Sequence, residues 1–285
     1  MDQLRIQEEP HLHDATLVLA LSGWMDGGDV STGTVARLVH LAQARPIAEI
    51  DPEPFYIYNF PGSMEIAAMF RPHIEIEDGL IKAVKMPANT FFCHDSANLL
   101  LFIGKEPNLH WPTYGDCLLK MAQIVGVKQI LFVGSFGGAV PHTREPHLYV
   151  TASDSKLLPD LESCGFRPSN YEGPGSFTTY LMTRAKSEGL DMTSLVAEIP
   201  GYLQGTNPLS IEAVTRHLAK ILNLPLDLTE LRTASNEWEI QVSEAVAEDD
   251  ELATKVRQLE EHYDNDLIGK PEDDPDDEEG NSTYI

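Results

Sequence analysis

Two glycine-rich turns carry the side chains best suited to chemistry, and each follows an apolar run. The first lies in LVLALSGWMDGGDVSTGTV (residues 17–35) and holds Trp24 and Asp26. Backbone amides at the start of a following helix could bind an anion there, with Asp26 or Asp29 as an acid or a ligand. Carboxylates repel phosphate, however, and the lysine of a phosphate-binding P-loop is missing. A structural turn explains the stretch better, with Asp29 or Ser31 capping the helix and Trp24 covering the sheet.

The second turn lies in GSFGGAVPHTREPHLY (residues 134–149). Amides near Gly137 and Gly138, with His142 and Arg144 close behind, could bind an anion or a nucleotide phosphate at the carboxyl end of a sheet. A nucleoside- or nucleotide-binding protein, or a phosphorylase-like enzyme, could use such a cleft. The structural alternative is a loop whose glycines permit positive φ angles and whose histidines are solvated. The G-x-S-x-G motif of a hydrolase is absent, so we assign no catalytic residue.

Metal and cofactor motifs are missing from the sequence. It contains no H-E-x-x-H, no EF-hand loop and no clustered histidine and carboxylate spacing, so we predict no metal site and no cofactor. The three cysteines, Cys93, Cys117 and Cys164, form no C-x-x-C pair. An odd number of unpaired cysteines is typical of free thiols in a reducing cytoplasm.

Charge and hydropathy exclude two further classes of partner. The 45 acidic and 20 basic residues give a net charge of −25, which argues against binding to nucleic-acid phosphates. The N-terminus is acidic where a signal peptide is basic, and no apolar run approaches the roughly 18 residues of a membrane span. We therefore expect a cytoplasmic protein that binds neither nucleic acid nor membrane.

Short apolar runs alternate with helical patterns along the first part of the chain. Runs with little alternation predict strands covered on both faces. Helices are indicated between them, one of them stopped by Pro46 and another capped by Asn207 with Pro208 at its first position. This alternation predicts a helix, sheet, helix sandwich. The predicted strands are residues 17–23, 55–60, 99–107, 129–135, 147–153 and 194–200.

The character of the sequence changes near residue 234. We expect an α/β/α core domain over residues 1–233, a C-terminal helical extension over 234–266 and a disordered acidic tail over 267–285. The second helix of the extension aligns apolar residues four, three and four positions apart. These side chains could pack on the core or against another subunit. The tail holds seven carboxylates between Glu272 and Glu279, and such a segment buries too little surface to offset its ordering entropy.

Taken together, these stretches resemble the proteasome assembly chaperone 2 family, particularly its bacterial and actinobacterial members. The likeness rests on SGWMDGGDVSTGTV, FVGSFGGAVPHTREP, IPGYLQGTNPLSIEAVTRHLAKILNLPLDLTEL and ASNEWEIQVSEAVAEDDELATKVRQLEEHYD, in that order. The family implies a three-layer α/β/α sandwich similar to purine nucleoside phosphorylases, and members that form homo- or hetero-oligomers. It implies no catalytic residue, and the tryptophan and glycine turn becomes part of the architecture.

The C-terminal residues add a candidate contact with a protein partner. Relatives can engage proteasome α rings through a terminal motif of a hydrophobic residue, tyrosine and any residue. Here the chain ends in Thr283, Tyr284 and Ile285, with threonine in the hydrophobic position. A free carboxylate could pair with a basic pocket while Tyr284 buries its ring. We therefore expect a non-enzymatic, oligomeric assembly-chaperone-like or adaptor protein that docks a proteasome or similar ring assembly through Tyr284 and Ile285.

Overall fold

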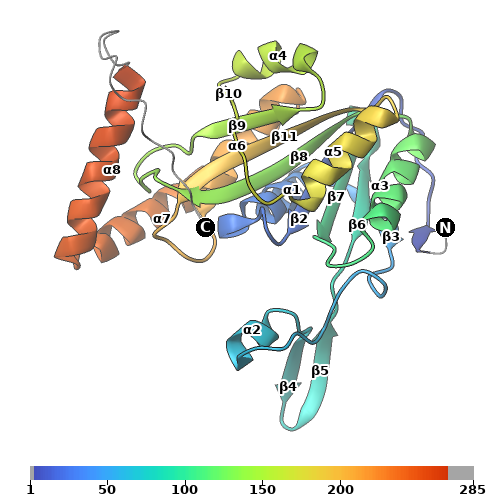
Figure 1. The fold of residues 1–285 in the computed structure, drawn as a ribbon, viewed down its shortest axis with the longest axis horizontal. Coiled ribbons are helices and arrows are strands. Elements are labelled where there is room, and N and C mark those ends of the chain that lie inside the picture. The colour runs from blue at the N-terminus through green and yellow to red at the C-terminus, as the bar shows by residue number, and fades with distance from the viewer. Residues whose placement is uncertain (1–2, 269–285) are drawn as a thin grey trace.

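The chain from residue 3 to residue 268 is described by a computed structural model, and one large sheet forms its centre (Figure 1). Nine strands are arranged in the order β1-β3-β6-β7-β2-β8-β11-β9-β10. The central strands β7, β2, β8 and β11 are parallel, and the pairs β1/β3, β3/β6, β6/β7 and β9/β11 are antiparallel. The bounds are β1 Leu4–Ile6, β2 Ala15–Ser22, β3 Arg45–Ile50, β6 Thr90–His94, β7 Leu99–Lys105, β8 Val127–Gly138, β9 Leu148–Ala152, β10 Arg167–Pro168 and β11 Asp191–Pro200.

The middle of the sheet is buried on both faces. In β2, Leu17 and Leu19 belong to the core on one face, and Val18 and Ala20 belong to the core on the other. This two-sided burial is the reason that the strand reads as a continuous apolar run. Five predicted strands correspond to β2, β7, β8, β9 and β11 and are confirmed.

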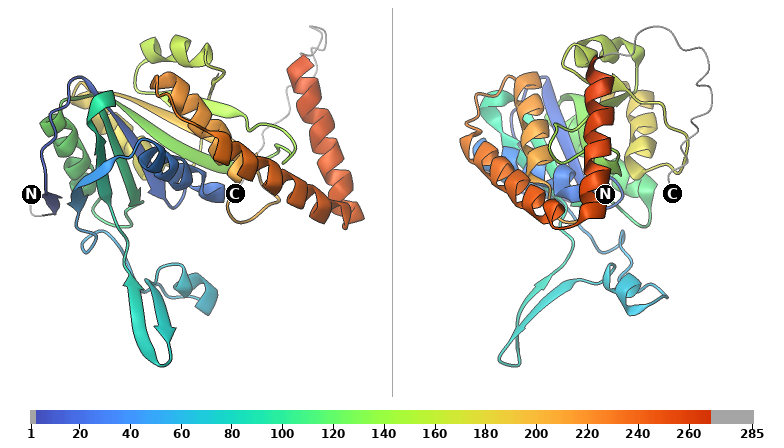
Figure 2. Two further views of the ribbon diagram at one scale, coloured as in Figure 1. Left: turned by 180° about the vertical axis from the view of Figure 1, so that it is seen from behind. Right: turned by 90° about the vertical axis from the view of Figure 1, so that its left-hand side faces the viewer.

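Helices cover both faces and complete three layers (Figures 1 and 2). The helices α3 (Trp111–Val125) and α5 (Phe177–Ser187) lie on one face, and α1 (Val30–Leu41) and α6 (Pro208–Ile221) lie on the other. The predicted α/β/α sandwich is confirmed. The likeness to purine nucleoside phosphorylases stays a prediction. A short helix, α4 (Leu158–Glu162), precedes β10, and single 3-10 turns occupy Gly27–Asp29, Asp95–Ala97 and Ser155–Leu157.

Local sequence signals explain some helix ends and not others. Asn207 caps α6, because its side chain accepts a hydrogen bond of 2.9 Å from the backbone nitrogen of Ser210. The prediction that Pro46 stops the first helix is wrong. That helix, α1, ends at Leu41, the chain reverses through Gln43 at a φ of 53°, and Pro46 lies inside β3. Proline is tolerated there because the strand pairing is irregular beside it.

Two long helices follow the sheet and pack on their own chain (Figure 2). The first is α7 (Thr229–Ala247), and Leu231 in its first turn is buried in the same core as α1 and α6. The second, α8 (Asp250–Ile268), runs back beside the loop before β9 and buries Val256 and Tyr263. The sequence left open whether this extension packs on the core or on another subunit, and within residues 3–268 it packs on the core.

An extended segment at residues 57–88, here called the arm, projects away from the sheet (Figures 1 and 2). It contains the short helix α2 (Met64–Ala68) and a hairpin of β4 (His73–Glu77) and β5 (Leu80–Lys85), which pair only with each other. The prediction of a strand over residues 55–60 is wrong. Phe55 and Tyr56 are buried beneath the sheet edge, but the chain then leaves the body, so those apolar residues have no strand to pair with.

Candidate functional site

The two glycine-rich turns meet at one edge of the sheet. They follow β2 and β8, which are adjacent and parallel, so both turns lie at the carboxyl ends of these strands. The backbone nitrogen of Ser135 donates to Met25 at 2.9 Å, and the Ser135 hydroxyl donates to the carbonyl of Gly27 at 2.7 Å. The structure therefore joins the two predicted candidate turns into one site.

The first turn is fixed by Asp26. Its carboxylate accepts hydrogen bonds from the backbone nitrogen of Thr32 at 3.0 Å and from the Thr32 hydroxyl at 2.7 Å. Burial raises the pKa of Asp26 to about 6, although these two hydrogen bonds act in the opposite direction. The expected cap, Asp29 or Ser31, does not occur, because Asp26 reaches the first turn of α1 instead. Asp26 thus holds the turn against the helix.

Trp24 does not cover the sheet. Its side chain is 64% exposed, which contradicts the interpretation of this residue as a lid. The turn leads Trp24 outward because the preceding residue, Gly23, has a φ of 138°, a region that side chains rarely adopt. The backbone nitrogen of Trp24 donates to Glu106, which also accepts from the first residue of α5, Phe177.

Gly137 and Gly138 serve close packing of the backbone. A Cβ on Gly138 would lie 2.2 Å from the carboxylate of Glu198, and one on Gly137 would lie 3.3 Å from the Cα of Gly201. The backbone nitrogen of Ala139 donates to Glu198 at 2.7 Å. The space where an anion could approach these amides is therefore occupied by a carboxylate of the same chain.

His142 is buried and fully engaged. Its Nδ1 lies 2.7 Å from the hydroxyl of Tyr202, and its Nε2 lies 3.1 Å from the hydroxyl of Ser243 in α7. Burial lowers the pKa of His142, so the neutral ring is favoured at neutral pH. The expectation of a solvated histidine in the structural alternative is wrong, because α7 covers this ring.

Arg144 pairs with carboxylates of α8. Its guanidinium donates two hydrogen bonds of 2.8 Å to Asp264, and Glu260 lies 3.8 Å away. Hydrogen bonding to Arg144 lowers the pKa of Asp264, as a bidentate ion pair should. A phosphate would have to displace both carboxylates. The side chain proposed as an anion ligand therefore fastens the C-terminal helix to the loop.

Two further residues of this site were not predicted from the sequence. Glu198, in β11, accepts from His147 at 3.3 Å and from Tyr149 at 3.2 Å. Burial alone would raise the pKa of Glu198, but these hydrogen bonds and the one from Ala139 hold it below its ordinary value. Tyr263, in α8, stacks on His147. A lone carboxylate within the apolar run SLVAEIP was a usable signal for Glu198, whereas Tyr263 had no sequence signal pointing to that loop.

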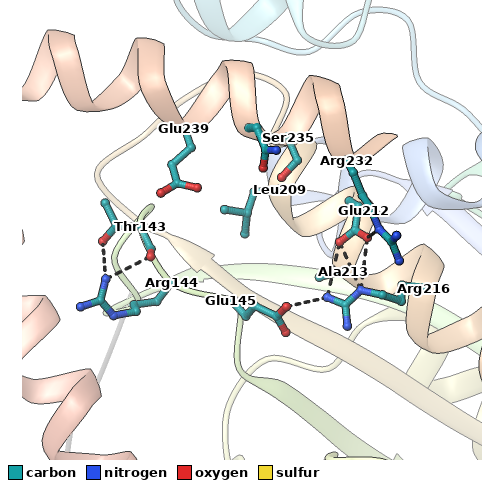
Figure 3. A pocket seen from close by; sticks show the side chains of 11 residues that line it. Thr143, Arg144, Glu145, Leu209, Glu212, Ala213, Arg216, Arg232, Ser235 and Glu239 are labelled. Carbon is teal, nitrogen blue, oxygen red and sulfur yellow. Dashed lines mark hydrogen bonds and ion pairs between the residues drawn. The ribbon is translucent and has the colours of Figure 1, made fainter. Parts of the chain in front are cut away.

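A groove of about 330 Å³ lies between this loop, α6 and α7 (Figure 3). Its charges are balanced and largely paired. Arg216 bridges Glu212 and Glu145, at 3.2 Å and 2.6 Å, and Arg232 lies 3.5 Å from Glu212. Such a groove offers no concentrated charge to an anion or a cation. Its charged lining residues are Arg144, Glu145, Glu212, Arg216, Arg232 and Glu239.

Over residues 3–268, no group of three histidine, cysteine, aspartate or glutamate side chains is arranged to hold a metal ion. Within the same part of the chain, no helix is long and apolar enough to cross a bilayer. The terminal Tyr284 and Ile285 lie outside the described residues.

Several solved protein structures share this fold. The chain resembles a Mycobacterium tuberculosis proteasome-assembly chaperone homologue, with 29% identity, a TM-score of 0.72, and coverage of 85% of this chain and 99% of that chain. It is similar to a PAC2 family protein from Streptomyces avermitilis, with 25% identity, a TM-score of 0.71, and coverage of 85% and 100%. A Mycobacterium tuberculosis protein of unknown function shares the fold at 24% identity and a TM-score of 0.81, over 93% and 92% of the two chains.

A search of curated proteins returns no match. The model of the PAC2 family matches residues 20–246, which include both glycine-rich turns, the central strands β7, β8 and β11, and nearly all of α7. This match spans most of the chain, and it agrees with the resemblance seen in the four sequence stretches. The chain therefore belongs to the PAC2 family.

Proposed function

We propose that the protein is a non-enzymatic, oligomeric assembly-chaperone-like adaptor that acts on protein partners in the cytoplasm. The observation that carries this proposal is membership of the PAC2 family together with the likeness to a proteasome-assembly chaperone homologue over nearly that protein's whole length. The partner class that fits is a proteasome or a similar ring assembly.

The geometry of the carboxyl edge supports a role other than catalysis. Each polar side chain that could have served a small-molecule ligand is used within the chain: Asp26 by α1, His142 by Tyr202 and α7, and Arg144 by α8. These contacts bind the loop to the C-terminal helices. The alternative of a phosphorylase-like enzyme gains no support from them, because its anion site would need the same groups to be free.

Docking is assigned to the C-terminal residues Tyr284 and Ile285. A penultimate tyrosine can bury its ring while the terminal carboxylate pairs with a basic pocket on the partner. The seven carboxylates between Glu272 and Glu279 would be attracted to a basic rim around such a pocket. The contacts of α8 with Arg144 and His147 would fix the end of α8, from which this segment starts.

Binding of a purified 20S proteasome to the immobilised full chain tests the proposal. Deletion of Tyr284 and Ile285, or the single substitution Tyr284→Ala, is expected to lower the affinity at least tenfold. Thr283→Ala is the matched control and should bind like the wild type. The motif calls for a hydrophobic residue at this position, and Thr283 already departs from it, so its loss should remove no contact that docking uses. Circular dichroism of every variant should match the wild type, since the changes lie outside residues 3–268, which form the sheet and its helices. Equal binding by the wild type and the deletion variant would remove the terminal residues from the mechanism.

A further inference from the structure

The arm exposes an unusual amount of apolar surface. No residue from 57 to 88 is buried. Ile74 and Val84 face each other across the hairpin, as do Ile76 and Ile81, so one face of this small sheet is apolar and open to solvent. Ile76 is 66% exposed and Ile81 is 67% exposed. The exposed large apolar side chains of the arm are Phe60, Met64, Ile66, Met69, Ile74, Ile76, Leu80, Ile81, Val84 and Met86.

Such a hairpin needs a partner surface. A two-stranded hairpin is marginally stable at best in water, and it gains stability when its apolar face is packed. Monomeric proteins also rarely expose large contiguous apolar patches. The arm has four carboxylates and three basic side chains, so its net charge is −1, whereas the net charge of the whole chain is −25. Its binding face is therefore apolar rather than electrostatic, and the arm has no net positive charge that would select a nucleic acid or an anionic surface.

Three further exposed apolar side chains lie at the carboxyl ends of neighbouring strands of the same chain. Trp24 follows β2, Leu109 follows β7, and Phe136 lies near the end of β8, with exposed fractions of 64%, 43% and 40%. We call these three residues the edge patch. The arm and the edge patch account for most of the exposed large apolar side chains over residues 3–268, and the rest are Tyr171, Ile240, Leu267 and Ile268.

The root of the arm is fastened beside the edge patch, but the arm leads away from it. The carbonyl of Phe55 accepts hydrogen bonds from the backbone nitrogens of Asn108 and Leu109, at 2.9 Å and 3.0 Å. The backbone nitrogen of Ile57 donates to the Asn108 side chain at 3.2 Å. From this fixed root the hairpin extends outward from the body (Figures 1 and 2). The chain's own arm thus leaves its edge patch uncovered.

We propose that the arm of one copy packs its apolar face on the edge patch of a second copy. The occupant is a second copy because both sets of exposed apolar side chains belong to this one chain, at the same edge, and neither set is covered by any other part of residues 3–268. The nearly neutral arm also allows two bodies of strongly negative charge to join with little repulsion. Because the two surfaces differ, two copies can exchange arms about a two-fold axis, or successive copies can join head to tail, which closes a ring where the rotation allows it.

This inference supplies the surface for the oligomer named in the proposed function, and its test needs no docking partner. The molar mass of the full chain is measured by size-exclusion chromatography with light scattering. The wild type is expected to exceed the 31.6 kDa of one chain by an integral factor. The double variant Ile76→Lys with Ile81→Glu introduces a cross-strand ion pair in the hairpin and removes its apolar face. The variant Trp24→Glu alters the edge patch. Each variant alone is expected to be monomeric.

A mixture of the two variants distinguishes the arm-to-edge contact from packing of one arm on another. The edge-patch variant still has an intact arm, and the arm variant still has an intact edge patch, so an equimolar mixture should form a dimer. A mixture that stays monomeric would overturn the arm-to-edge contact, since arm-to-arm packing cannot be restored in this way. A monomeric wild type, or variants that keep the wild-type mass, would overturn it as well.

Ile240→Glu, on the exposed side of α7, is the matched control and should not change the mass. Leu80→Asp at the hairpin tip is a second arm variant if the first fails to fold.

Discussion

The ring of Tyr263 in α8 stacks on the imidazole of His147, with the ring centroids 4.6 Å apart and the planes 8° apart. The Tyr263 hydroxyl also donates to the carbonyl of Glu145 at 3.0 Å. Residues more than a hundred positions apart are thereby joined at the glycine-rich loop. This contact, with the ion pair of Arg144 and Asp264, makes the C-terminal helix part of the site.

Truncation of Tyr263 tests how much this stacking contributes to stability. Tyr263→Ala removes a buried ring and its hydrogen bond, so we expect the free energy of unfolding to fall by about 3 kcal/mol. Tyr263→Phe keeps the ring and loses only the hydrogen bond, which should cost about 1 kcal/mol. Urea titration followed by circular dichroism measures both. Equal losses for the two variants would show that stacking contributes nothing.

Gly138→Ala should destabilise the fold because its new Cβ would collide with the carboxylate of Glu198. The distance of 2.2 Å leaves no room, and overpacking of this kind costs about 1–3 kcal/mol. Gly175→Ala is the matched control, since no atom lies within 4 Å of the position that its Cβ would take. Thermal unfolding compares the two, and a Gly138→Ala variant as stable as the control would contradict the packing role.

The buried carboxyl of Asp26 predicts a specific dependence on pH. Its pKa of about 6 in the folded chain lies above its ordinary value near 4, so the folded state binds more protons between these values. This group therefore lowers the free energy of unfolding as the pH rises from about 4 to about 6. Denaturant titration measures the free energy of unfolding of the wild type minus that of Asp26→Asn. This difference should fall as the pH rises through that window and then level off. A difference that does not vary with pH would contradict the burial of Asp26.

Phosphate and nucleosides at millimolar concentration should not raise the melting temperature. A ligand at a hundred times its dissociation constant would stabilise the fold by about 2.7 kcal/mol, which a thermal-shift assay detects readily. We expect no such shift, because Arg144 is paired with Asp264 and Glu260. A clear rise that disappears in Arg144→Ala would instead favour a phosphorylase-like ligand site at the glycine-rich loop.

The sequence determined the layers and most of their boundaries. Uninterrupted apolar runs such as LVLALSG can be buried on both faces only in the middle of a covered sheet, and Asn207, Pro208 and Gly126 mark helix ends through backbone chemistry that acts over a few residues. For the same reason the family resemblance, which rests on four such stretches in order, agreed with the comparisons.

Tertiary structure decided how the candidate residues are used. His142 and Arg144 were read as free because their partners, Ser243 and Asp264, are about a hundred residues away in the sequence. The arm was missed because its short alternating strands pair only with each other, and their apolar side chains predict burial that the chain itself does not supply. Local patterns specify backbone conformation and which residues favour burial, but the three-dimensional fold alone determines which distant groups meet and which surfaces stay uncovered.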